Sequence, residues 1–80
     1  MVSAAPNPSA SYFNLSAQGT FDEPVEIKVV NQMGNVIETR KGMPAKGNLQ
    51  IGITYRPGIY FVEFSQGGEK VVLKLDKQSN

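Results

Sequence analysis

The stretch GIYFVEFSQGGEKVVLKLDK, residues 58–77, decides the fold of this chain. It contains two runs rich in Val, Ile, Leu, Phe and Tyr on either side of Gly67-Gly68, and paired glycines between such runs predict a β-hairpin with a two-residue turn. In the first run, Ile59 to Ser65, one face holds Tyr60, Val62 and Phe64, and the other holds Ile59 and Phe61. Apolar residues on both faces are typical of a central strand. The second run, Lys70 to Asp76, alternates between apolar and polar residues. We therefore expect Val71, Leu73 and Leu75 to point inward and Lys70, Lys74 and Lys77 to lie on the exterior.

The same alternation recurs along the chain. Further runs occur at intervals of roughly 10 to 12 residues, each closed by Gly, Pro or Asn, namely Tyr12 to Ala17, Val25 to Val30, Val36 to Arg40 and Leu49 to Ile53. No stretch sustains the helical period of about 3.6 residues. The chain is therefore predicted to be all-β, an immunoglobulin-like antiparallel β-sandwich of six to seven strands, the seventh being residues 6–8 if they pair.

Turn residues define the connections between these strands. Asn31-Gln32-Met33-Gly34 has Asn at the first and Gly at the fourth position, which suits a type I turn followed by a left-handed residue, so Gly34 is expected to be structural. Gly42 to Gly47 holds Pro44 between two glycines and is predicted to be a six-residue loop. Tyr55-Arg56-Pro57-Gly58 predicts a tight turn into the central strand.

The composition limits the chemistry of this chain. Eight Lys plus Arg against seven Asp plus Glu leave a net charge of +1, well short of the basic excess of a nucleic-acid-binding domain. Neither cysteine nor histidine is present, so disulfides, thiolate or imidazole metal sites and Ser-His catalysis are excluded. No apolar run is long enough to span a bilayer. We expect no enzyme, no cofactor, no metal site and no nucleic-acid partner.

Two groups of side chains could still suggest an activity. The carboxylates are Asp22, Glu23 and Glu26. Their spacing fits a solvated turn better than a catalytic pair facing across a cleft. The aromatic residues are Tyr12, Phe21 and Tyr55. They could stack on a sugar, although aromatic residues in alternating runs more often belong to the core or its rim.

The segment Gly58-Ile59-Tyr60 is similar to the tyrosine corner of immunoglobulin-type sandwiches. In that motif, a tyrosine near the start of a late strand donates its hydroxyl hydrogen back to the backbone a few residues upstream. A plain core tyrosine is the alternative interpretation. Neither one implies an activity.

Several motifs follow one another in order along the chain. It has Pro6-Asn7-Pro8 near its start, the hairpin Asn31 to Gly34, the turn Pro57-Gly58-Ile59-Tyr60, and a final strand around Lys74. Together these motifs resemble the C-terminal sorting domain of cargo exported by the type IX (Por) secretion system of Gram-negative bacteria. The resemblance covers Pro6 to Lys77, and Asn31 replaces the Asp usual in the family hairpin.

The resemblance implies a role in protein export. Residues 6–77 would be the sorting domain, residues 1–5 an added start and the remnant of a linker, and residues 78–80 a tail. The domain would be a non-enzymatic signal on a covalently attached N-terminal cargo, which travels through the periplasm and the outer-membrane translocon to the cell surface or medium. A sortase-like protease would then remove the domain, and the Pro-Asn-Pro kink would separate the cleavable linker from it.

The motif residues are the candidates for recognition, namely Pro6, Asn7, Pro8, Gly34, Gly58, Tyr60, Lys74 and Lys77. We hypothesise that the final strand, with the charges of Lys74 and Lys77, forms part of the surface that the translocon binds, because an open sandwich has edge strands that can accept a partner strand. Protection of the edge against aggregation is the alternative role for these lysines. The alternative functions are an accessory carbohydrate-binding module and a structural module, including a homodimer paired through edge strands.

Overall fold

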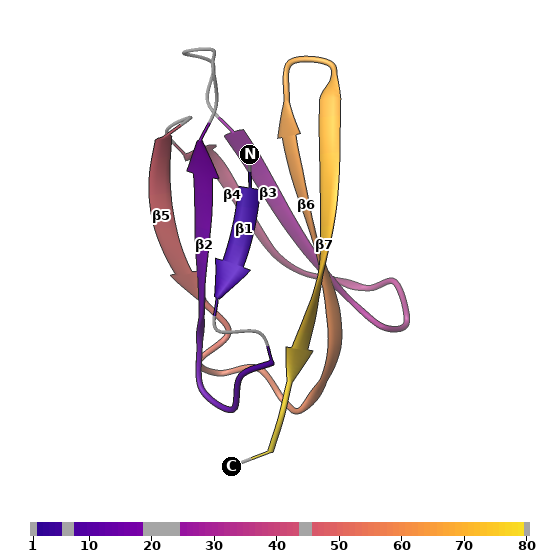
Figure 1. Ribbon diagram of the computed structural model, residues 1–80. Helices are drawn as coiled ribbons and strands as arrows, with labels where there is room; N and C mark the ends of the chain where they lie inside the picture. Colours follow the sequence, from indigo (N-terminus) through magenta and orange to yellow (C-terminus); the bar gives the residue numbers. More distant parts are fainter. Residues whose placement is uncertain (1, 6–7, 19–24, 44–45, 80) are drawn as a thin grey trace.

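A computed structural model describes residues 2–5, 8–18, 25–43 and 46–79 (Figure 1). The described residues form seven strands and no helix. These are β1 (Val2–Ala5), β2 (Phe13–Gln18), β3 (Val25–Asn31), β4 (Val36–Met43), β5 (Lys46–Ile51), β6 (Gly58–Gln66) and β7 (Glu69–Lys77). The prediction of an all-β fold is therefore confirmed.

Two antiparallel sheets pack face to face, as in an immunoglobulin-like sandwich (Figure 1). The smaller sheet has the order β1-β2-β5, and the larger one has the order β4-β3-β6-β7. β6 thus pairs on both sides, which confirms that Ile59 to Ser65 belong to a central strand. β7 is an edge strand of the larger sheet.

The core lies between the sheets and comes from the inward positions of alternating strands. Val25, Ile27 and Val29 of β3 are buried, while Glu26 and Lys28 between them are exposed. The other buried apolar side chains are Phe13, Leu15, Ile51, Tyr60, Val62, Phe64 and Leu75. The alternation of the sequence therefore identified the inner faces of β2, β3 and β6 correctly.

The turn between β3 and β4 has the predicted conformation. The backbone N–H of Gly34 donates to the Asn31 carbonyl at 2.9 Å, and Gly34 has a φ of +88°. The Asn31 carboxamide oxygen accepts the backbone N–H groups of Met33 and Asn35, each at 3.0 Å. A left-handed residue after a type I turn is the geometry for which glycine is suited, so the structural role of Gly34 is confirmed.

The predicted loop over Gly42 to Gly47 is wrong at its ends. β4 continues through Gly42 to Met43, and β5 begins at Lys46, while Pro44 and Ala45 lie outside the described residues. The reason is a bulge: the register shifts between Val25 and Ile27, and Gly42 has a φ of +78°. A glycine at positive φ adds one residue to the strand without ending it.

The strand predicted over Leu49 to Ile53 begins and ends earlier than expected, at Lys46 and Ile51. β5 ends at Ile51, and Gly52, with a φ of +92°, begins a turn through Ile53 and Thr54 that the N–H of Tyr55 closes by donating to the Gly52 carbonyl at 3.1 Å. The side chain of Ile53 is 69% exposed.

The N-terminal residues form a strand where a linker remnant was expected. Val2–Ala5 pair antiparallel with β2, from Val2 opposite Ala17 to Ala5 opposite Asn14. Ser9, only a few residues later, forms a parallel bridge with Lys77 in the other sheet. The chain therefore crosses from one sheet to the other between Ala5 and Ser9, so folded structure lies on both sides of the Pro-Asn-Pro segment.

The β6–β7 hairpin differs from its prediction at one side chain. Gly67 has a φ of +58° in the two-residue turn, and Leu75 is buried as expected, but Val71 is 46% exposed. Val71 stands opposite Phe64 on the inner face. Phe64 is only 3% exposed, so at this level the inner face is covered at central β6 but not at the edge strand β7.

Candidate recognition surface

The structure distributes the predicted site residues over separate places. Pro8 is exposed between β1 and Ser9, Gly34 closes the β3–β4 turn, and Lys74 is exposed on β7. Pro6 and Asn7 lie outside the described residues. Gly58 begins β6 and stands opposite Lys77 of β7. The described members of this set therefore lie on separate parts of the molecule.

Gly58 and Tyr60 border an open hollow of about 200 Å³ at one end of the larger sheet. Its lining residues are Asn31, Gln32, Met33, Pro57, Gly58, Ile59 and Tyr60. The hollow lies between the β3–β4 turn and the start of β6. Two of the predicted motif regions, the hairpin and the Gly-x-Tyr turn, therefore meet there.

Tyr60 has the hydrogen bond of a tyrosine corner. Its hydroxyl donates to the Arg56 carbonyl at 2.6 Å, and its side chain is buried. The Tyr55 ring packs against it at a centroid distance of 4.9 Å. Because the bond spans only four residues, it holds the turn before β6 in place. Tyr60 therefore forms a tyrosine corner. The sequence alone did not distinguish this role from that of a plain core tyrosine.

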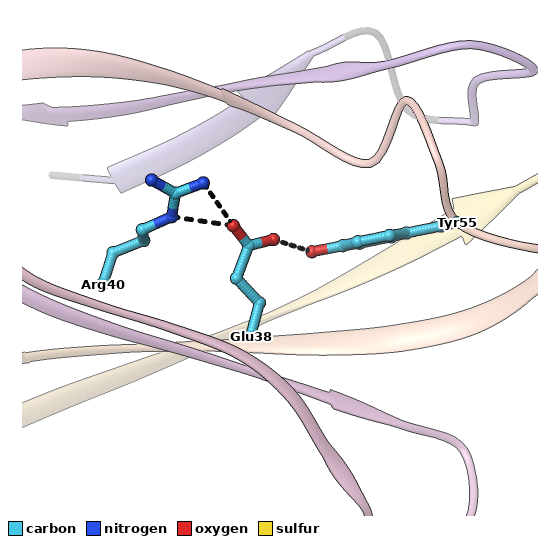
Figure 2. A network of polar contacts seen from close by, with 3 residues as sticks. All are labelled: Glu38, Arg40 and Tyr55. Carbon is cyan, nitrogen blue, oxygen red and sulfur yellow. Dashed lines mark hydrogen bonds and ion pairs between the residues drawn. The ribbon is translucent and has the colours of Figure 1, made fainter.

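A polar network closes the side of the sandwich at β4 (Figure 2). The Tyr55 hydroxyl donates to a Glu38 carboxylate oxygen at 2.5 Å, and Arg40 contacts the other oxygen at 2.7 Å. Burial, together with the negative carboxylate that accepts its hydrogen bond, raises the pKa of the Tyr55 hydroxyl above its ordinary value. Tyr55 is therefore part of the fold and not an exposed surface for sugar stacking.

Of the other two aromatic residues in the sugar-stacking prediction, the structure describes only Tyr12, which is partly exposed, while Phe21 lies outside the described residues. The same holds for two of the three candidate carboxylates, Asp22 and Glu23, while Glu26 is exposed on β3. Nothing in the geometry of the described residues supports either interpretation.

Lys77 lies inside the protein, not on its exterior, so this prediction is wrong. Lys77 is only 5% exposed, and its Nζ donates hydrogen bonds to the backbone carbonyls of Ser11 and Gly52. The physical reason is strand register, because Lys77 shares the inner face of β7 with Leu73 and Leu75. A buried ammonium group is tolerated only where hydrogen bonds replace its water. The charge of Lys77 is therefore not part of the outer surface.

The remaining exposed feature of the C-terminal strand is its free edge. Asp76 directs its carbonyl away from β6, because this oxygen accepts the N–H of Ser9 at 3.0 Å. The register with β6 continues without a shift, and the backbone groups of a strand alternate in direction. The N–H and C=O groups of Lys70 and Val72 therefore also point away from β6. The edge is covered at Asp76, whereas no described strand pairs with Lys70 or Val72 on this side.

Among the described residues, no three His, Cys, Asp or Glu side chains are grouped so that they could hold a metal ion. Within the same residues, no helix has the length and apolar character needed to cross a membrane.

Fold and surface together define a small all-β sandwich whose C-terminal strand has an open edge. A family model described as secretion system C-terminal sorting domain matches residues 3–78 of the 80-residue chain. The chain belongs to this family, which confirms the resemblance. Membership indicates a C-terminal sorting signal of the type IX secretion system, and it implies export through the outer membrane to the cell surface and interaction with that machinery. The family is generally non-catalytic. No curated protein matches the chain.

Sequence reasoning missed three residues that connect distant segments of the chain, namely Ser9, Gly52 and Glu38. The inward register of Lys77 was the available signal for the first two, because a buried ammonium group requires acceptors nearby. No sequence pattern pointed to Glu38. Its partner Tyr55 lies in the β5–β6 connection, and alternation of apolar and polar residues does not predict the path of a connection.

Proposed function

We propose that this domain is the export signal of a longer protein. It is attached at the C-terminus of a cargo, is bound in the periplasm by the type IX machinery, and directs the cargo through the outer-membrane translocon. A sortase-like protease then removes it at the cell surface. The domain itself catalyses no reaction and binds no cofactor. Family membership over residues 3–78 supports this proposal.

The free edge of β7 is the observation that carries the mechanism. Unpaired backbone groups on an edge strand can accept an added strand, and neighbouring side chains then give selectivity. At the open part of the edge, Val72 is 51% exposed and stands between Lys70 and Lys74 on the outer face. A component of the translocon binds here by pairing an extended strand with β7.

Lys70 and Lys74, the lysines beside this edge, have two compatible effects. Their side chains are exposed, and Nζ of Lys70 lies 3.1 Å from a carboxylate oxygen of Glu63 on β6. Lysines on an edge strand discourage pairing between identical copies, because like charges would meet. The same charges favour an incoming strand that carries acidic residues. Lys77 contributes to the fold and not to this recognition.

The cleaved bond lies on the N-terminal side of β1. Residues 2–5 are paired along β2, and a paired strand does not readily enter a protease active site, which requires an exposed, extended segment. The cleavable linker therefore precedes β1.

A reporter carrying residues 2–80 at its C-terminus tests the mechanism in a host that has the type IX system. Val72→Pro removes an N–H that points away from β6, so no internal hydrogen bond is lost, but an added strand can no longer pair there. Val72→Thr keeps the N–H and is the matched control. We expect Val72→Pro to reduce export strongly and Val72→Thr to leave it unchanged. Equal export of both variants, with equal folding stability, would contradict recognition through this edge.

A further inference from the structure

The end of β7 is held by two other parts of the chain. Ser9 forms backbone hydrogen bonds with both sides of Lys77: its N–H donates to the Asp76 carbonyl at 3.0 Å, and its carbonyl accepts the N–H of Gln78 at 2.8 Å. The Ser9 hydroxyl donates to the Tyr12 carbonyl at 2.7 Å and accepts the N–H of Ser11 at 3.1 Å. The segment before β2 is therefore folded around the end of β7.

The Lys77 side chain extends this connection to the other sheet. Its Nζ donates to the carbonyl of Ser11, which precedes β2, and to the carbonyl of Gly52, which follows β5. β2 and β5 are neighbours in the smaller sheet, whereas β7 belongs to the larger one. One ammonium group thus joins both sheets at this end of the sandwich.

The position of Gly52 is itself fixed by the core. A Cβ placed on Gly52 would lie 2.8 Å from Cδ2 of Phe13, a side chain with no exposed surface. The carbonyl of Gly52 also accepts the N–H of Tyr55 at 3.1 Å. The carbonyl of Gly52 is therefore held in place by contacts other than Lys77, and it cannot turn to water without disturbing the core.

We propose that Lys77 is a latch that holds this end of the sandwich closed. Without Lys77 and Gln78, the carbonyls of Ser11 and Gly52 have no donor from β7, and Ser9 has only one of its two backbone partners. The segment over residues 9–12 and the end of β7 then open together. If the proposed export function holds, a cargo truncated before Lys77 presents a signal that is open at this end. The latch itself does not depend on that function, because folding is measured without export.

Lys77→Met tests the latch in the complete 80-residue chain, since Met keeps much of the unbranched stem but donates no hydrogen bond. Lys74→Met, three residues earlier on the exposed face, is the matched control. We expect Lys77→Met to accelerate hydrogen exchange at the Ser9 and Gln78 amides by roughly 30-fold. The amide of Val62 in central β6 accelerates less, and Lys74→Met leaves all three rates near wild type. Equal acceleration at the three amides, or none, would overturn the proposal.

Chain length provides a second test that holds even if Lys77→Met does not fold. The urea midpoint of unfolding is measured for three chains. One ends at Gln78, one ends at Asp76, and one ends at Gln78 and carries Lys77→Met. We expect only the unmodified chain ending at Gln78 to retain the unfolding midpoint of the full chain. If the chain ending at Asp76 keeps the same midpoint, Lys77 and Gln78 are dispensable and the latch does not exist. If Lys77→Met keeps it, the ammonium group is not the latch.

Discussion

The Tyr55 hydroxyl donates a hydrogen bond of 2.5 Å to the Glu38 carboxylate and thereby joins the β5–β6 connection to the edge strand β4. Glu38 stands opposite Val29 and Arg40 stands opposite Ile27, so both charged side chains are on the inner face of β4. Inward-pointing charges on an edge strand discourage further strands from pairing there. The two outer strands of the larger sheet therefore differ along their middle. β4 carries this charged network on its inner face, whereas the inner face of β7 holds Val71, Leu73 and Leu75, with charges only at its two ends.

Loss of the Tyr55 hydroxyl should weaken the fold moderately. Tyr55→Phe removes the bond to Glu38 but leaves this carboxylate paired with Arg40. We expect the free energy of unfolding to fall by about 1 to 2 kcal/mol, as is usual for a hydrogen bond to a charged group. Urea unfolding at neutral pH measures the change. Tyr12→Phe removes a hydroxyl from another partly exposed tyrosine and should cost less, so an equal loss in both variants would argue against the network.

The same hydroxyl predicts a dependence of stability on alkaline pH. The folded protein raises the pKa of Tyr55 above its ordinary value of 10.0, so above that pH the folded state retains a proton that the unfolded state releases. The contribution is complete below pH 10 and decreases as the pH rises further. The stability difference between wild type and Tyr55→Phe should therefore be constant from about pH 7 to 9 and shrink above about pH 10. Urea midpoints of both proteins at each pH provide the measurement. A stability difference between wild type and Tyr55→Phe that grows above pH 10 would contradict the prediction.

Replacing Gly52 with alanine should destabilise the fold more than replacing Gly68 with alanine. Gly52→Ala places a methyl group 2.8 Å from the Phe13 ring in a left-handed conformation, and strain of this kind costs about 1 to 3 kcal/mol. Gly68→Ala is the control, because nothing lies within 4 Å of its added Cβ and its φ is not positive. Thermal unfolding should show a clearly lower midpoint for Gly52→Ala alone.

Alternation in the sequence predicted most of the core but not its extent. Val62 and Phe64 were placed correctly because every second residue of a strand shares a face. Val71 obeys the same rule and still remains 46% exposed, because alternation does not tell how far the opposite sheet reaches. The bulge at Gly42 likewise depends on how β4 pairs with β3, which local composition does not determine.

The candidate site was predicted less completely than the fold. Lys77 was assigned to the exterior from its charge, although its register with Leu75 indicated the inner face. The two acceptors of Lys77 come from residues 11 and 52, and no local pattern connects positions so far apart. Lys74, by contrast, was placed correctly on the exposed face, because neither its charge nor its register conflicts with that position.

The most direct test of the central claim is the fraction of a periplasmic reporter that leaves the cell when residues 2–80 are fused to its C-terminus. We predict that the fused reporter reaches the surface or medium in a host with an intact type IX system, and that it stays in the periplasm when the translocon is deleted. The unfused reporter should stay inside in both hosts. A folded fusion that is retained by the intact host as fully as the unfused reporter would show that this domain is not an export signal.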